Sequence, residues 1–284
     1  IAMLAGNFSN IILDYVFIYL FKWGMFGASF ATGIGPVISI CCLSAHFIKK
    51  QNQFKLIKTR FLLHTVADFC KLGISSFVNE LSTGAVIMIF NFLFLGLGGN
   101  TAVAAYGIVA NVALFAVSIF TGIAQGIQPL VSDYYGKSMT GQLKAVLKDA
   151  VVVALVLTAA IVAFSNLFND GIVALFNKSG DPLLQSIAKE GITIYFLGFF
   201  PGSLNIVLAG YLSAMEKAEK GFIISLLRGL VIIAPSAWLL SRFFGMTGVW
   251  TAIPVTETIT LLAALLMKTI YPPLSSSETP QLPV

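Results

Sequence analysis

The chain has 284 residues, of which 57% are hydrophobic and 10% are charged, and its mean hydropathy is +0.91. Ordinary soluble domains carry about 25% charged residues, so this composition excludes a soluble enzyme or binding domain and indicates a polytopic membrane protein. The formal net charge of +5 does not indicate nucleic-acid binding, because the basic residues lie in short segments between apolar runs, a pattern that orients membrane proteins.

The first apolar segment, residues 1–20, contains a single charged residue, Asp14. Asn10 lies four residues earlier, on the same face of the predicted helix. An ionisable group in a membrane segment costs at least about 2.5 kcal/mol at the bilayer centre, so it normally faces a protein interior or a wet cavity. Asp14 and Asn10 are therefore candidate site residues.

Basic residues separate two groups of spans. Residues 1–48 predict two spans joined by a tight turn, and residues 49–71 form a basic linker that the positive-inside rule places in the cytoplasm. A helical bundle is expected over residues 72–268. The tail, 269–284, is rich in Pro and Ser and is expected to be disordered and cytoplasmic.

The first apolar run of the bundle, 72–97, begins at Leu72 and carries one charge, Glu80. Small and polar residues, including Asn91, follow Glu80 on one face of the predicted helix, and Met88 lies nearby. A carboxyl group in a low-dielectric site can exchange a proton for a cation, which is the chemistry of ion coupling. The alternative is that Glu80 only hydrogen-bonds a neighbouring helix.

The later spans also contain polar residues. Asn111 and Gln125 share one face of a charge-free span, and Asn205 follows Pro201 in another. Glu257 lies inside the last span, where ion coupling, an external cavity and simple packing are all open roles. In total the sequence predicts eight spans, over residues 1–20, 28–48, 72–97, 102–132, 150–168, 191–213, 221–240 and 249–267.

A short internal repeat relates the two groups of spans. The sequence GMFGASFAT at 24–32 is similar to GMTGVWTAI at 245–253, and each copy joins two spans in the same direction. A parallel repeat of this kind suggests two similar halves. If the halves match, four further spans precede residue 1, and the parent protein has twelve spans in two bundles of six.

Several segments resemble one transporter family. Residues 10–32, which read NIILDYVFIYLFKWGMFGASFAT, resemble the fifth and sixth helices of multidrug and toxic compound extrusion (MATE) transporters. SSFVNELSTGAVIMIFN at 75–91 is similar to the seventh helix, and the segments at 99–112 and 122–136 resemble the eighth. The resemblance covers essentially the whole chain and is strongest to the MepA-like and DinF-like bacterial branches.

The resemblance implies an all-α, polytopic antiporter that exports organic, often cationic, compounds in exchange for H⁺ or Na⁺. It implies that Glu80 binds the coupling cation, with a possible Na⁺ nearby, and that Asp14 serves the coupling or substrate site. One position departs from the pattern, because Gly202 stands where sodium-coupled, NorM-like members carry an acid. The coupling ion is therefore left open.

We accordingly expect a non-enzymatic, cation-coupled exporter in a bacterial plasma membrane, monomeric at full length. Its partners are small organic cations and lipid, with no nucleic acid, no cofactor and no structural metal. A lipid-linked oligosaccharide flippase and a non-transporting membrane scaffold are the alternatives. The residues expected to line the substrate cavity are Asn10, Met88, Asn91, Asn111, Gln125 and Asn205.

Overall fold

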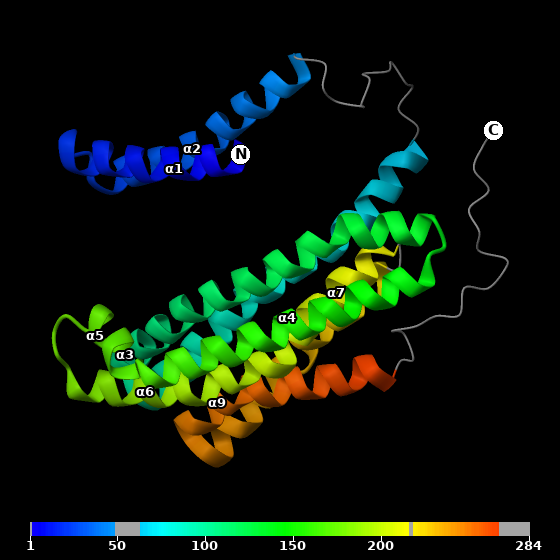
Figure 1. Ribbon diagram of the computed structural model, residues 1–284. Helices are drawn as coiled ribbons and strands as arrows, with labels where there is room; N and C mark the ends of the chain where they lie inside the picture. The colour runs from blue at the N-terminus through cyan, green and yellow to red at the C-terminus, as the bar shows by residue number, and fades with distance from the viewer. Residues whose placement is uncertain (1, 49–62, 216–217, 267–284) are drawn as a thin grey trace. The chain divides into compact units, whose positions relative to one another are not determined.

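The structure is a computed structural model that describes residues 2–48, 63–215 and 218–266, with side chains over 2–45, 81–215 and 219–266. This part of the chain is helical and has no strand, which confirms the predicted all-α membrane fold (Figure 1). Most of the predicted linker, residues 49–62, and the predicted tail, 269–284, lie outside the described residues. The chain divides into two units, 1–62 and 63–284, and we describe each by itself.

The first unit is a helical hairpin. It consists of α1 (Ala2–Tyr15), the π-helical turn η1 (Val16–Leu20) and α2 (Gly24–Ile48). The two arms pack closely at Gly6, where an added Cβ would lie 2.7 Å from the carbonyl oxygen of Gly35. Small residues of this kind let membrane helices approach each other at backbone distance.

Two long helices of the second unit each reverse direction at a glycine. The helix α3 (Leu63–Gly136) changes course at Gly99, whose φ is +63°. The rings of Phe90 and Tyr106 have centroids only 5.5 Å apart, although 16 residues of straight helix would separate them by about 24 Å. The chain therefore crosses twice within α3, as Figure 1 shows. The helix α9 (Ile233–Leu266) reverses in the same way at Gly245, with φ +59°.

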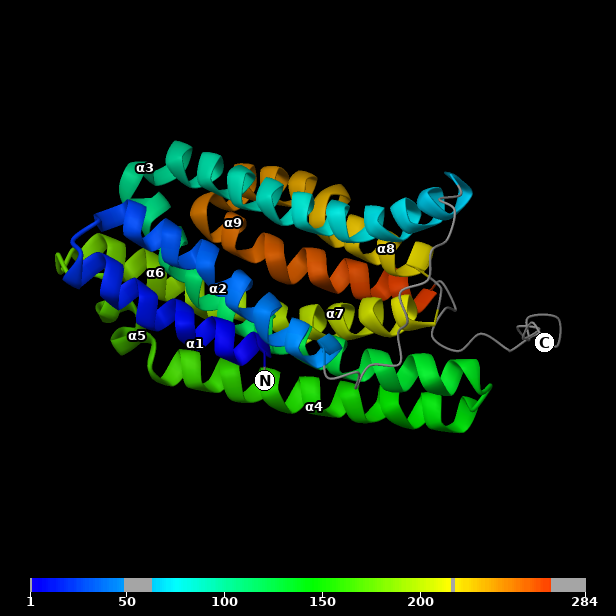
Figure 2. The ribbon, with the colours of Figure 1, turned by 90° about the horizontal axis from the view of Figure 1, so that it is seen from above.

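These reversals lead to the predicted number of crossings. Six helical stretches of the described chain are long and apolar enough to span a membrane, and two of them, 81–136 and 219–266, contain a reversal. The described residues thus provide eight crossings. The elements between α3 and α9 are α4 (Thr140–Leu167), α5 (Asn169–Phe176), α6 (Pro182–Tyr195), η2 (Phe196–Gly198), α7 (Phe199–Ala214), α8 (Ala218–Leu226) and the π-helical turn η3 (Leu227–Val231). Figures 1 and 2 both show α4 lying along α7.

Several helices begin earlier than the predicted spans. The helix α3 begins at Leu63, inside the predicted linker, and α6 begins at Pro182 instead of residue 191. Hydropathy indicates only which residues lie in the hydrocarbon core of the bilayer. The backbone hydrogen bonds of a helix can continue into the polar residues on either side of that core. At α6 the Asp181 carboxylate also caps the helix by accepting hydrogen bonds from the backbone N–H groups of Leu183 and Leu184, at 2.9 and 3.4 Å.

The two copies of the internal repeat have the same backbone feature. Each copy begins with a glycine in the left-handed region, Gly24 with φ +55° and Gly245 with φ +59°. L-residues with a side chain rarely adopt this conformation, so glycine is needed at the point where each hairpin turns. The sequence similarity therefore corresponds to a shared local structure.

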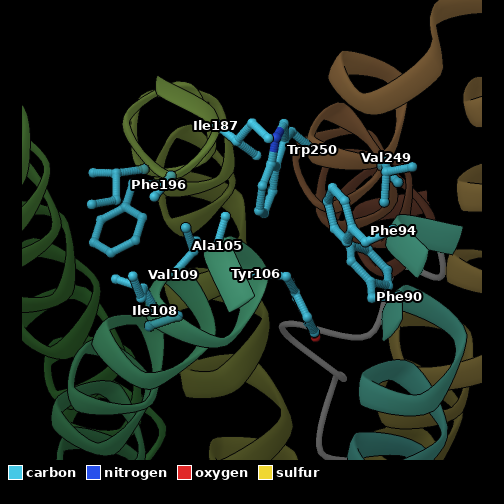
Figure 3. Close-up of a cluster of buried hydrophobic side chains, with 14 of the residues drawn as sticks. Phe90, Phe94, Ala105, Tyr106, Ile108, Val109, Ile187, Phe196, Val249 and Trp250 are labelled. Atoms are coloured by element: carbon cyan, nitrogen blue, oxygen red, sulfur yellow. The ribbon is translucent and has the colours of Figure 1, made fainter. Parts of the chain in front are cut away.

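The core of the second unit is aromatic and is centred on Trp250, which is fully buried. Figure 3 shows its indole between the segments that carry Ile187 and Phe94, and the ring centroids of Phe94 and Trp250 lie 4.3 Å apart. Gly191 makes room for the indole, because an added Cβ would lie 2.7 Å from Trp250 Cζ2. This cluster joins α3, α6 and α9.

An exposed ion pair joins α5 to α6. Lys189 Nζ lies 2.7 Å from Asp170 Oδ1, and the side chains are 41% and 76% exposed. The hydrogen bond from Lys189 lowers the pKa of the Asp170 carboxyl below its ordinary value. A carboxylate with a lowered pKa stabilises the fold above its unfolded pKa and loses that effect as the pH falls through its folded pKa. Solvent screening keeps the effect small here.

Candidate functional site

The second unit encloses a cavity of about 450 Å³ among its membrane-spanning helices. Both arms of α3 and of α9 line it, together with α6, η2, α7, α8 and η3. Its surface combines aromatic and aliphatic side chains with uncharged polar ones, among them Tyr106, Tyr195, Thr121, Gln125, Gln128 and Ser225. A mixed surface of this kind, with few polar groups on an apolar wall, is typical of small-molecule sites.

One ion pair lies in the wall of this cavity. Glu257 Oε1 accepts hydrogen bonds from two nitrogens of Arg228, from Nε at 3.0 Å and from Nη2 at 2.5 Å. Glu257 is 7% exposed, and the Arg228 side chain is 22% exposed. They are the two charged residues among the described residues that line the cavity, so their charges cancel. A charge at this depth needs such a partner.

Asn205 completes the coordination of the carboxylate. Its Nδ2 group donates to Glu257 Oε2 at 2.7 Å and to the Glu257 backbone carbonyl at 2.9 Å. Its Oδ1 atom is buried and has no hydrogen-bond partner among the described residues. Gly202, one helical turn before Asn205, leaves space for the acid, because an added Cβ would lie 3.3 Å from Glu257 Cδ.

Local backbone structure positions these groups. Arg228 lies in η3, a π-helical turn, whereas Asn205 and Glu257 lie in the α-helices α7 and α9. Single π-helical turns inserted into longer helices are frequent at functional sites. The ion pair therefore joins an acidic group on an α-helix to a basic group on a π-helical turn.

Two of the predicted cavity residues lie at this site. Gln125 lines the cavity, and Asn205 is fully buried beside Glu257. Met88 and Asn91 line a different hollow, of about 550 Å³, to which both arms of α3 contribute. Asn111 is exposed and donates its Nδ2 to the Gly107 carbonyl of its own helix at 2.7 Å. The roles of these residues in substrate binding stay predictions.

The two predicted coupling acids lie in different units. Glu80 lies in the first arm of α3, and its side chain falls outside the described side chains. Asp14 lies in α1, where its Oδ1 atom and the Nδ2 atom of Asn10 are buried without a hydrogen-bond partner among the described residues. A buried, unpartnered carboxylate oxygen is suited to binding a proton or a cation. Coupling by Asp14 and Glu80 stays a prediction.

The pairing of Arg228 with Glu257 was not predicted from the sequence. The sequence pattern singles out Glu257 as a charge inside the last apolar span, and Arg228 lies inside the preceding one. The available signal was that opposite charges in two neighbouring spans normally pair with each other. Applied here, it pairs Glu257 with the basic residue of the preceding span.

Comparisons with known proteins agree with the membrane fold. The MatE family model matches residues 76–239. The multidrug export protein MepA of Staphylococcus saprophyticus is 27% identical over 269 residues, and MepA of Staphylococcus aureus is 28% identical over 272. Each alignment covers 94% of this chain and 58% of the relative, so the chain spans somewhat more than half of the relatives' length.

A solved structure supports the fold independently. The outward-facing conformation of a multidrug resistance MATE family transporter of the MOP superfamily superimposes with a TM-score of 0.86. Its sequence is 22% identical, and the match covers 94% of this chain and 60% of that one. At this identity the similarity establishes a shared helical architecture.

Proposed function

Since this chain belongs to the MatE family, we propose that the full-length protein exports organic, often cationic, compounds across a membrane in exchange for H⁺ or Na⁺. The chain is a multi-pass membrane protein, and the relatives reported above are named multidrug export proteins. The observation that carries the proposal is the cavity of about 450 Å³ among membrane-spanning helices, with a carboxylate in its wall.

The cavity has the properties that such a substrate requires. Its volume lies within the range of about 300–1,000 Å³ that is usual for small-molecule sites. The rings of Tyr106 and Tyr195 offer faces that attract cations, and the apolar wall accepts varied shapes. Electrostatic attraction is also stronger in this low-dielectric setting than in water. A flippase for pyrophosphate-linked lipids would need several free basic groups, whereas Arg228 is the one basic lining residue among those described and is paired.

Ion coupling is proposed to rest on Asp14 and Glu80. Each is an acid in an apolar span, where a proton or Na⁺ can neutralise it. If the ion and the substrate favour opposite-facing states, or compete for one carboxylate, each changes the affinity for the other by linkage. That reciprocal effect produces exchange, and it requires no cofactor.

Ethidium efflux tests this proposal. In inverted vesicles that carry the full-length protein, Glu80→Gln and Asp14→Asn are each expected to reduce ethidium transport about tenfold or more, with unchanged protein amounts. Comparing vesicles with and without Na⁺ then identifies the coupling ion. Asp133→Asn is the matched control, because Asp133 is half exposed and pairs with Lys137 at 2.8 Å. Full transport by both coupling variants would contradict the proposal.

A further inference from the structure

The surroundings of Glu257 are rich in hydrogen-bond acceptors. Both carboxylate oxygens of Glu257 lie there beside the amide group of Asn205, whose Oδ1 atom is buried. Among the described residues, Oε1 receives its hydrogen bonds from Arg228 alone, and the Asn205 oxygen receives none. Without the guanidinium, this buried group of acceptors would require another cation.

The acidic side of the site is held in place independently of Arg228. Asn205 donates one hydrogen bond to the Glu257 side chain and another to its backbone carbonyl, so the two residues are joined at two points. Both residues are buried, and they lie in the α-helices α7 and α9. Loss of the guanidinium therefore leaves the carboxylate and the amide in position.

Arg228 is the partner that can leave. Its side chain is long, is 22% exposed and lines the cavity, where water can hydrate a released guanidinium. The same cavity gives a small cation access to Glu257. If a ligand with one positive charge takes the place of the Arg228 guanidinium, the negative charge of the Glu257 carboxylate is still neutralised.

We propose that Glu257 and Asn205 form a cation-binding site whose resting occupant is the Arg228 guanidinium and whose external ligand is a guanidinium-bearing organic cation. The planar fork of Arg228 places two N–H donors on one carboxylate oxygen, and a ligand with the same group reproduces that contact. Na⁺ fits less well, because it forms no directional N–H bonds and the two carboxylate oxygens do not complete its shell. The site adds a substrate class to the proposed function. Binding of the ligand is independent of that function, and only export of the bound ligand rests on it.

Binding to an arginine-deleted variant tests the site without transport. In the purified full chain in detergent, Arg228→Ala is expected to bind methylguanidinium saturably and about tenfold or more tightly than the unaltered protein, as measured by calorimetry. The double variant Arg228→Ala with Glu257→Gln is expected to lose this binding. Equal binding by the single and double variants, or equal competition by Na⁺ at the same ionic strength, would overturn the proposal.

A second measurement uses the unaltered protein and so does not depend on a variant that folds. Arg228 on Glu257 is expected to react slowly with phenylglyoxal. Because methylguanidinium also consumes this reagent, the rate at Arg228 is divided by the rate at Arg242, which lies 5.6 Å from the Trp238 ring and is the internal reference. Methylguanidinium is expected to raise this ratio about fivefold or more, as mapped by mass spectrometry. An unchanged ratio would refute the exchange. If methylguanidinium replaces Arg228 at Glu257 but the protein does not export ethidium, the proposed transport function is refuted and the binding site is not.

Discussion

Replacing Arg228 with alanine is expected to lower the free energy of unfolding by about 3–5 kcal/mol, because the Glu257 carboxylate loses its charge partner while remaining buried. The loss is large because both N–H donors on Oε1 come from this one side chain. Asn205 still holds Oε2 but cannot neutralise the charge. Denaturant-induced unfolding in detergent measures the change.

Two comparisons separate an uncompensated charge from a general loss of packing. Adding Glu257→Gln to Arg228→Ala removes the unpaired charge, so the double variant should be more stable than Arg228→Ala alone. Lys189→Ala breaks the exposed pair with Asp170 and is expected to change stability far less. If the double variant were less stable than Arg228→Ala, the ion pair would not be the source of the effect.

Trp250→Ala is expected to lower the free energy of unfolding by about 3 kcal/mol or more, through the cavity that it leaves in the core. The indole is fully buried, lies 4.3 Å from the Phe94 ring and fills the space above Gly191. In lipid the transfer of apolar surface contributes little, so most of the cost comes from lost packing contacts.

Trp238→Ala is the matched control, because Trp238 is 56% exposed. It removes the same number of atoms but leaves no internal void, so the same unfolding measurement should give a much smaller change. Equal effects at the two positions would show that the aromatic core around Trp250 does not carry the stability assigned to it.

The fold could be predicted from the sequence because membrane spans depend on local features. Runs of apolar residues predicted the crossings, and the gaps between the predicted spans, 98–101 and 241–248, contain the turns now found at Gly99 and Gly245. Helix ends were predicted less well, since α3 begins at Leu63 and α6 at Pro182, outside the apolar runs. Capping and continued backbone hydrogen bonding decide those ends, and hydropathy does not report them.

The site could be predicted only in part, because it depends on contacts between distant segments. Helical periodicity placed Gln125 on a polar face, and the structure places it on the cavity wall. The same periodicity grouped Asn111 with Gln125, yet Asn111 bonds a carbonyl of its own helix. The contact between Arg228 and Glu257 joins residues 29 positions apart across a chain reversal. A one-dimensional pattern does not specify such a pairing.

Filling the cavity tests most directly whether it lies on the export path. Ethidium efflux is measured for the full-length protein with Gln125→Trp, which places an indole at the cavity wall, and with Ile119→Trp on the same helix. Ile119 is 42% exposed and is not among the described lining residues. The account predicts that Gln125→Trp lowers efflux about tenfold while Ile119→Trp keeps most of it. Equal efflux by the two variants would contradict the assignment of this cavity to transport.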